Sequence, residues 1–411
     1  MFSSSGVFRD QGGKLLDGME SRLYLEGGSC ICGMWEPFRE IHVINDRMRK
    51  KMNIKIFVMT HKLFERPNDP MYVPLQVGHA LHGTLDESYL RDDGGEDNIS
   101  GQNPYFSELT GMYWIWKQCR DTDYVGVCHY RRFPVIKDCG RERLMTEGDC
   151  ERILKEYDLI TTEKLTLHSN YYEGFAVDHN LHDLQVTEQV VQEKYPDFAA
   201  CFERLVHSNQ VYFGNICVMP KRLYDEYCSF LFDILFEVQR RIDVTGYDGY
   251  RKRVFGFLSE FLQMVWIQVR GLKPYECRIA IIGEKFETGE VKRTLSGFFK
   301  NRDVQGAKDY FLKCYEKRPD ILMEASDITG DLRICMQIIS TCEFEKSASG
   351  SCILDKENDM QRLVLLFKAL NGAVIRMSKG EDTEADRGML ESGLITETGV
   401  AVARRVMGVE K

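Results

Sequence analysis

Short apolar runs alternate with amphipathic segments through the middle of this chain. The strand candidates share short length and β-branched or aromatic residues: 54–59, 124–128, 157–161 and 211–219. The helix candidates share a period of about 3.6 residues: 105–119, 147–156, 183–194, 221–241 and 254–269. Strands that alternate with helices predict an α/β domain over 52–296, in which flanking helices cover a mostly parallel sheet.

The pattern changes after residue 296. Strand signals stop, and the segments 304–317, 331–341 and 358–371 are amphipathic at helical spacing. Pro319 and Gly330 interrupt them, and no fixed repeat period relates them to one another. These features predict a helical C-terminal domain over 297–411.

The first 51 residues have little periodicity and end in the basic stretch 47–51. A buried strand begins directly after Met52, so one interpretation takes Met52 as the true translation start. The other takes 1–51 as an N-terminal extension. Under both interpretations we expect little order in this segment.

Composition narrows the functional class. A net charge of −9 disfavours nucleic acid as a partner. The 14 cysteines include no CxxC pair, and the chain shows no signal peptide and no apolar run long enough to span a membrane. We therefore expect a cytoplasmic protein, and the basic stretch 47–51 leaves peripheral contact with the inner face of the plasma membrane open.

Ligands of open α/β sheets bind beyond the carboxyl ends of the strands, which directs attention to the loops there. The first loop holds Thr60, His61 and Lys62, and the second holds the segment 129–132 (His129, Tyr130, Arg131 and Arg132). Guanidinium groups suit phosphate oxygens, so the two arginines are candidate ligands of a diphosphate. The alternative is that they form salt bridges with acidic surface residues.

An acidic segment over 91–98 includes Asp92 and Asp93. It offers the oxygen ligands that Mg²⁺ or Mn²⁺ takes, but its spacing departs from that of a calcium-binding loop. A solvated loop, or a turn that orders over substrate, explains it better.

A second polar segment contains His179, His182 and Asp183. The spacing predicts two imidazoles on one face of a helical turn, next to a carboxylate. Three roles stay open: contact with sugar hydroxyls or phosphate, a structural role, and a zinc site with His168 as the third ligand.

Glu260 is the leading candidate for a catalytic base. It stands in 255–260 (Phe-Gly-Phe-Leu-Ser-Glu), where neighbouring aromatic residues could raise the pKa of its carboxyl group. A glutamate in the first turns of a helix also has an ordinary capping role. Asp248 and Asp178 are the rival bases.

Several ordered motifs, spread over some two hundred residues from Met52 to about Arg270, resemble a family of bacterial capsular and exopolysaccharide glycosyltransferases of the domain-of-unknown-function type. The motifs are 55–62 (Lys-Ile-Phe-Val-Met-Thr-His-Lys), 74–78 (Pro-Leu-Gln-Val-Gly), 90–100, Asn103-Pro104, 108–110 (Glu-Leu-Thr), 113–117 (Tyr-Trp-Ile-Trp-Lys), 123–133 and 253–260. The segment 318–327 resembles helical tails attached to such enzymes.

The resemblance implies a GT-A-like, Rossmann-like fold and transfer of a sugar, with galactose or galactofuranose as the first expectation. The donor would be a UDP-sugar and the acceptor a lipid-linked oligosaccharide. GT-A enzymes typically end the corresponding strand in a metal-binding Asp-x-Asp, whereas this chain has Cys128, His129, Tyr130 and Arg131 there. Because of that departure, the resemblance does not firmly imply a metal cofactor, and we assign no residue as a metal ligand. It favours arginines as the groups that stabilise the departing UDP.

The resemblance and the loops together give a hypothesis for the site. Donor binding falls to Thr60, His61, Lys62, Asp92, Asp93, His129, Tyr130, Arg131, Arg132 and Asn215. Acceptor binding falls to Asp178, His179, His182, Asp183 and Arg253, and base catalysis to Glu260 or Asp248. Two other functions stay open, a non-catalytic scaffold of a polysaccharide assembly complex and a sugar-phosphate transferase.

Overall fold

The computed structural model describes residues 52–138, 140–323 and 326–409, and the predictions made for 1–51 lie outside them. The described residues from Met52 onward form one compact unit.

The main sheet has the strand order β11-β7-β10-β4-β1-β2-β3. Its strands are β1 (Ile54–Thr60), β2 (Tyr72–Gln76), β3 (Leu90–Arg91), β4 (Tyr124–His129), β7 (Leu159–Thr162), β10 (Cys217–Pro220) and β11 (Pro274–Cys277). Only β10 runs against its neighbours β4 and β7, and the other pairs along this order are parallel. The carboxyl ends of β1 and β4 therefore meet the amino end of β10, and this edge holds the site.

Smaller strands extend the sheet beside β4. β5 (Arg132–Asp138) pairs with β4, with β6 (Arg141–Leu144) and with β12 (Ile279–Ile281). A separate two-stranded ribbon joins β8 (Leu165–Thr166) to β9 (Gln210–Val211).

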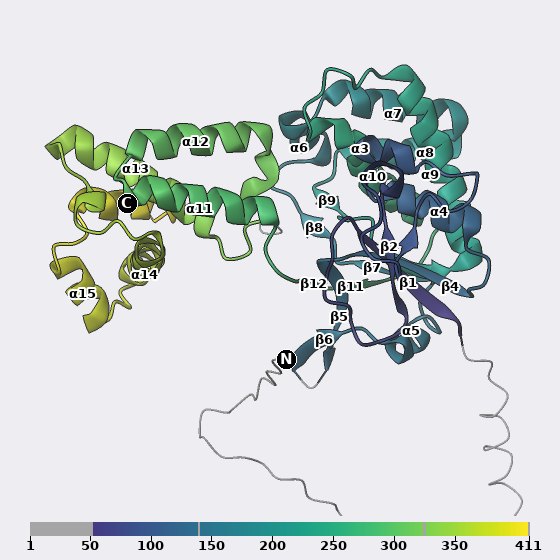
Figure 1. Cartoon of the computed structure of the whole chain (residues 1–411), viewed down its shortest axis with the longest axis horizontal. Coiled ribbons are helices and arrows are strands. Elements are labelled where there is room, and N and C mark those ends of the chain that lie inside the picture. The colour runs from purple at the N-terminus through teal and green to yellow at the C-terminus, as the bar shows by residue number, and fades with distance from the viewer. Residues whose placement is uncertain (1–51, 139, 324–325, 410–411) are drawn as a thin grey trace, which may run out of the picture. The chain divides into compact units, whose positions relative to one another are not determined.

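Helices cover both faces of the sheet, with most of them on one side (Figure 1). That side carries α3 (Asn103–Phe106), α4 (Leu109–Gln118), α7 (Leu181–Lys194), α8 (Pro196–Val206), α9 (Lys221–Arg241) and α10 (Val254–Val269), and α5 (Glu147–Ile153) lies on the other. The remaining short elements of this part are α2 (His79–His82), α6 (Tyr171–Asp178), and the 3₁₀ turns η1 (Ser100–Gln102) and η2 (Arg251–Arg253).

The two cores follow from side-chain alternation along the strands. Phe57 and Met59 of β1 pack into the large core under α4, α9 and α10, whereas Ile56 and Val58 pack into the smaller core with α5. Burial on both faces explains why β1 is an almost continuous apolar run rather than an alternating one.

The C-terminal region is helical. It comprises α11 (Phe286–Lys300), α12 (Val304–Lys317), η3 (Pro319–Leu322), α13 (Asp331–Ser349), η4 (Ile353–Asp355), α14 (Met360–Lys379), α15 (Glu384–Glu391) and α16 (Glu397–Val406). These helices bury a core of their own that includes Leu295, Phe299, Ile338 and Phe367. The predicted boundary at 296 falls inside α11, and the division into domains stays a prediction.

The fold class is confirmed: a mixed, mostly parallel sheet flanked by helices, with a helical C-terminal region. Two elements differ from the prediction, and in both the chain departs from regular structure at residues next to the candidate site. The expected helix 105–119 breaks at Ser107, and the expected strand 211–219 breaks between β9 and β10 at Gly214 and Asn215. All three residues have positive φ, which apolar periodicity does not reveal.

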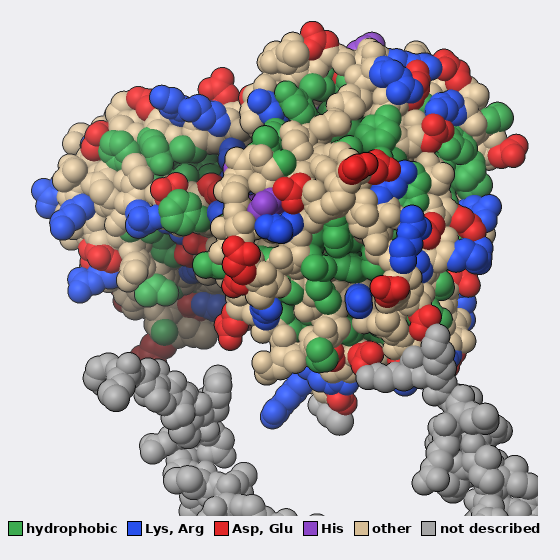
Figure 2. All heavy atoms as spheres, turned by 45° about the vertical axis from the view of Figure 1, so that its right-hand side comes forward, with side chains coloured by type: hydrophobic (Ala, Val, Ile, Leu, Met, Phe, Trp, Pro, Cys, Tyr) green, Lys and Arg blue, Asp and Glu red, His purple; other side chains and the backbone are tan. Residues whose placement is uncertain are grey.

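Two surface features bear on partners. None of the helices in the described ranges is both long and apolar enough to span a bilayer. On the face shown in Figure 2, acidic and basic side chains are interspersed among apolar ones, with no extended field of a single sign.

Candidate functional site

The segment 129–132 forms a tight hairpin in which the last residue of β4, His129, pairs with the first residue of β5, Arg132. The two adjacent arginines diverge. The Arg131 guanidinium donates from Nε to the carbonyl oxygens of Ile282 (3.2 Å) and Gly283 (3.1 Å). The half-buried Arg132 side chain instead lies beside Gly214, where an added Cβ would meet its Nη1 at 3.3 Å.

Gly214 links a histidine and a carboxylate through its backbone. The His129 ring donates from Nε2 to the Gly214 carbonyl (2.5 Å), and the Gly214 N–H donates to Glu260 Oε1 (2.7 Å). Gly214 has φ 90°, a conformation that glycine adopts without steric cost. The bend between β9 and β10 thus presents both backbone groups to the site.

Asn215 continues this bend, is fully buried and has φ 51°. Its Nδ2 donates to Glu108 Oε1 (2.7 Å), and its Oδ1 accepts from the Ser259 hydroxyl (3.0 Å). Next to Glu108, Ser107 has φ 50° and accepts from Arg253 Nε (3.0 Å). Two strained turns from distant parts of the chain therefore hold one set of polar side chains.

We call this set the Gly214 cluster: Glu108, His129, Arg132, Gly214, Asn215, Arg253 and Glu260. Within the part of the chain that the structure describes, Arg132 forms no ion pair or hydrogen bond through its side chain, and Arg253 has only Ser107 as a hydrogen-bond partner. The cluster thus holds two half-buried guanidinium groups that no carboxylate within 4.0 Å pairs with. Such groups are suited to bind an anion.

The pKa values of the two carboxyl groups in the cluster shift in opposite directions. Burial and the nearby Glu108 raise the pKa of Glu260 to about 8, although the Gly214 N–H, Arg132 and Arg253 work against the rise. Burial would also raise the pKa of Glu108, but His129, Arg253 and the Asn215 amide together lower it. Pairs whose pKa values diverge in this way are typical of acid–base sites, and Glu260 is the member able to exchange a proton near neutral pH.

The rival base Asp248 is engaged elsewhere. It accepts from the N–H groups of Tyr250 and Arg251 (2.8 Å each) and pairs with the Arg251 guanidinium (2.8 Å). Burial would raise the pKa of Asp248, but these hydrogen bonds lower it. Its main contribution is to fix η2, which directs Arg253 toward the cluster. The third candidate, Asp178 at the end of α6, is half-buried, and burial raises the pKa of its carboxyl group.

The 178–183 segment does not form the expected helical turn, because the chain leaves the helix at His179 between α6 and α7. His182 is exposed, so the expectation of two imidazoles on one helix face is wrong. His179 packs on Phe257 (4.2 Å between ring centroids) and stacks on Tyr250 (5.3 Å). Burial, with Arg251 and Arg253, lowers the pKa of His179 to about 4, so the ring is neutral.

Asp183 is fully buried at the start of α7. Its Oδ1 accepts from the Tyr247 hydroxyl (2.9 Å), whereas its Oδ2 has no partner among the described residues. The buried Nδ1 of His179 is likewise unpartnered. Unsatisfied buried polar atoms are rare in folded proteins, so both atoms are candidate ligand contacts.

The first loop lies beside the hairpin. His61 packs edge-on against Tyr130 (5.3 Å between centroids) and is exposed. Thr60 is buried, and its hydroxyl bonds the backbone of Lys62, so it shapes the loop. The Lys62 ammonium reaches Glu287 of α11 (3.4 Å).

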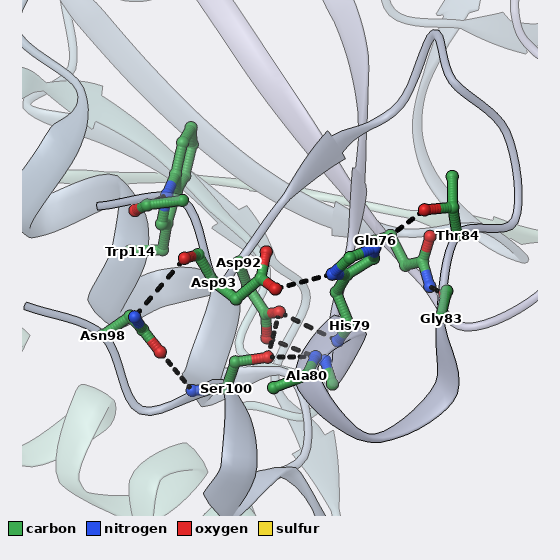
Figure 3. A network of polar contacts seen from close by, with 12 residues as sticks. Gln76, His79, Ala80, Gly83, Thr84, Asp92, Asp93, Asn98, Ser100 and Trp114 are labelled. Carbon is green, nitrogen blue, oxygen red and sulfur yellow. Dashed lines mark hydrogen bonds and ion pairs between the residues drawn. The ribbon is translucent and has the colours of Figure 1, made fainter. Parts of the chain in front are cut away.

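Asp92 and Asp93 lie in a different network (Figure 3). Asp92 is fully buried and accepts from the N–H groups of Gly78 (2.7 Å) and His79 (3.1 Å), and from the hydroxyls of Ser100 (2.5 Å) and Thr110 (2.6 Å). Asp93 pairs with His79 Nδ1 (2.6 Å). Four donors occupy both Asp92 oxygens, so this carboxylate fastens the loop after β2.

Two residues of the cluster, Glu108 and Gly214, are not among the site residues that the sequence predicts. Glu108 falls inside the helix that the sequence predicts over 105–119, where a charged residue next to apolar ones is ordinary, so the apolar pattern does not distinguish it. Among residues 52–138, 140–323 and 326–409, no group of three or more His, Cys, Asp or Glu side chains is arranged to hold a metal ion.

Comparison with known proteins gives one family match and one similar solved structure. A family model described as a domain of unknown function (DUF4422) matches residues 55–271. Among solved structures, the chain is similar to the apo structure of the WbbM bifunctional glycosyltransferase, with 26% identity and a TM-score of 0.52. That match covers 56% of this chain and 46% of the other, so this chain corresponds to about half of that protein. No curated protein matches.

The family model covers more than half of the chain, and it spans every residue of the Gly214 cluster. The similarity to a solved glycosyltransferase agrees with a shared fold. The chain therefore belongs to the DUF4422 family and has a glycosyltransferase-like fold.

Proposed function

We propose that this protein transfers a sugar, with galactose or galactofuranose as first candidates, from a UDP-sugar to a lipid-linked oligosaccharide during capsular or exopolysaccharide synthesis. The observation that carries the proposal is the Gly214 cluster, in which unneutralised arginines adjoin a carboxyl group whose pKa is about 8. The fold similarity to a glycosyltransferase supports it. Free thiols at all described cysteines suit a cytoplasmic location, where UDP-sugars are made.

In this proposal Arg132 is the main contact of the donor diphosphate. As the bond between the anomeric carbon and the phosphate oxygen breaks, negative charge grows on UDP, and a fixed guanidinium beside it lowers the barrier. Arg131 acts indirectly, since its contacts with Ile282 and Gly283 hold the hairpin that places Arg132. Thr60, His61, Lys62 and Tyr130 form the neighbouring wall of the donor site.

Glu260 is the proposed base. Its free oxygen takes the proton of the acceptor hydroxyl as that oxygen attacks the anomeric carbon from the face opposite UDP, which inverts the configuration. The raised pKa of Glu260 favours uptake of this proton, which the carboxyl group later loses to water so that the base is restored. We assign Asp178, His179, Asp183 and Arg253 to the acceptor side, where the unpartnered His179 Nδ1 and Asp183 Oδ2 are the candidate contacts of sugar hydroxyls.

The test is UDP binding, followed by UDP release from UDP-sugars. By calorimetry, Arg132→Ala should weaken UDP binding about tenfold or more, whereas the matched change Arg131→Ala should weaken it less. Sugar transfer should persist in EDTA, because arginines stand where related enzymes carry an Asp-x-Asp. Absence of UDP binding to the wild type would overturn the proposal, and loss of transfer in EDTA with rescue by Mn²⁺ would overturn its metal-free form. Release of a nucleoside monophosphate would instead indicate a sugar-phosphate transferase.

A further inference from the structure

A pocket of about 490 Å³ adjoins the Gly214 cluster at Arg253. Asp248, Gly249, Tyr250 and Arg253 line it from the loop before α10, and Lys317 and Arg318 line it from the end of α12. The helical C-terminal region therefore supplies part of the wall of a pocket next to the proposed reaction centre.

The pocket has an excess of positive charge. Its one acidic residue, Asp248, is already paired with Arg251. Lys317 is exposed and its ammonium forms no ion pair in the described parts of the chain, and Arg253 has no carboxylate partner. Two unneutralised cations thus face the pocket in a protein whose net charge is −9.

The third cation is held in place. Asp320 receives two hydrogen bonds from the Arg318 guanidinium (3.1 and 2.7 Å) and one from Lys285 (2.7 Å). This arrangement fixes the Arg318 side chain before any ligand arrives, which lowers the entropic cost of binding. Tyr250 adds a hydroxyl group that has no hydrogen bond to a described residue, on a ring that is itself buried.

The pocket meets the Gly214 cluster at Arg253, but the proposed donor contact Arg132 does not line it. Arg132 lies at the β4 hairpin, whereas the pocket opens on the side of η2, where Tyr250 stacks on His179. A glycosyl transfer needs one donor diphosphate, so a second cationic site beyond the base is suited to an anion carried by the acceptor.

We propose that Arg253, Lys317 and Arg318, with the Tyr250 hydroxyl, bind a diphosphate group on the acceptor, and that the helical C-terminal region thereby selects phosphate-linked acceptors. This inference rests on the proposed function and adds to it the group by which the acceptor is recognised. The volume is sufficient for a diphosphate together with part of an attached sugar.

The first experiment is calorimetric titration of the full chain with inorganic pyrophosphate in the presence of saturating UDP. Wild type should bind pyrophosphate, and Lys317→Glu should weaken that binding about tenfold or more without changing UDP affinity. Lys313→Glu is the matched control, because Lys313 is exposed on the same helix and does not line the pocket. Its affinity for pyrophosphate should change less than about twofold.

The second experiment is kinetic. With a glycan attached to an alkyl chain through a diphosphate, Lys317→Glu should raise the acceptor KM about tenfold, whereas with the same glycan lacking phosphate it should have little effect. Equal pyrophosphate affinity in Lys317→Glu and wild type, or pyrophosphate binding that occurs only without UDP, would overturn the inference. The second result would assign the phosphate contacts to the donor. Failure of UDP to bind the wild type would instead overturn the proposed function. The pyrophosphate titrations of wild type and Lys317→Glu would still test the pocket in that case.

Discussion

Two polar networks lie at the same edge of the sheet and differ in how completely they are satisfied. Asp92 receives four hydrogen bonds and has no exposed surface. In the Gly214 cluster, Arg132 has no bonded partner among the described residues, and the pKa of Glu260 is about 8. Both networks contain buried or half-buried carboxylates, so acidity alone does not distinguish them.

The difference separates a structural role from a chemical one. A carboxylate with all its acceptor positions filled has no capacity left for a ligand, and it stabilises the loop that surrounds it. Charges left without partners cost stability, and a fold retains them where a ligand compensates for them. Substitutions in the Gly214 cluster should therefore lower activity, whereas substitutions in the Asp92 network should lower stability.

The largest effect is expected from Glu260→Gln. Glutamine preserves the size of the side chain and can accept from the Gly214 N–H, but it cannot take a proton from the acceptor. We expect kcat for sugar transfer to fall about 10³-fold, with the fold intact by circular dichroism. Asp248→Asn is the comparison variant, and an equal or larger loss of kcat there would assign the base to Asp248.

The second prediction concerns the other network. Asp92→Ala leaves four donors without their charged acceptor, so the free energy of unfolding should fall by about 3 kcal/mol or more in urea titrations. Asp93→Ala removes one half-buried pair with His79 and should cost under about 1 kcal/mol. If Asp92→Ala were as stable as wild type yet lost UDP affinity, Asp92 would belong to the donor site and the contrast between the networks would fail.

Much of the fold could be predicted because burial produces periodicity. The strands at 54–60 and 124–129 and the helices at 221–241, 254–269 and 304–317 agree with their apolar patterns to within a residue. Strands β2, β5 and β12 are among those that the sequence does not predict. β2 and β5 each contain a proline, Pro74 and Pro134, which argues against a strand, and β12 has only three residues.

Sequence reasoning named several residues of the Gly214 cluster, but it could not give their geometry. Sequence reasoning singled out Arg132, Asn215 and Glu260, which the structure brings together around Gly214. It could not show that Arg131 turns toward Ile282, or that Ser107 and Asn215 adopt positive φ, because these outcomes depend on contacts between segments far apart in the chain.

The third prediction tests that backbone geometry. Asn215→Ala removes the hydrogen bond to Glu108 and puts a residue with poor tolerance of positive φ at a position where φ is 51°. We expect a loss of about 2 kcal/mol in the free energy of unfolding. Asn215→Gly removes the same hydrogen bond without backbone strain, so it should be about 1 kcal/mol more stable than Asn215→Ala. Equal stability of the two variants would show that strain at Asn215 is negligible.

The smallest effect is a dependence of stability on pH. Because the pKa of Glu260 is about 8 in the folded protein and near 4.3 in an unfolded chain, the folded state holds this proton more tightly. Stability contributed by the protonated group is therefore complete below the unfolded pKa and is lost as pH rises toward the folded value. Glu260→Gln removes that loss and should raise Tm relative to wild type by about 2 °C at about pH 9, with a smaller difference at about pH 5.

The opposite shift at Glu108 does not obscure this measurement. A carboxyl group whose pKa is lowered stabilises the folded state above its unfolded pKa, and that contribution disappears only in more acidic solution. The two carboxylates thus act in separate pH ranges, and melting curves recorded in the alkaline range report on Glu260. Parallel pH profiles for wild type and Glu260→Gln would mean that Glu260 ionises normally, and the Gly214 cluster would then resemble the satisfied network around Asp92.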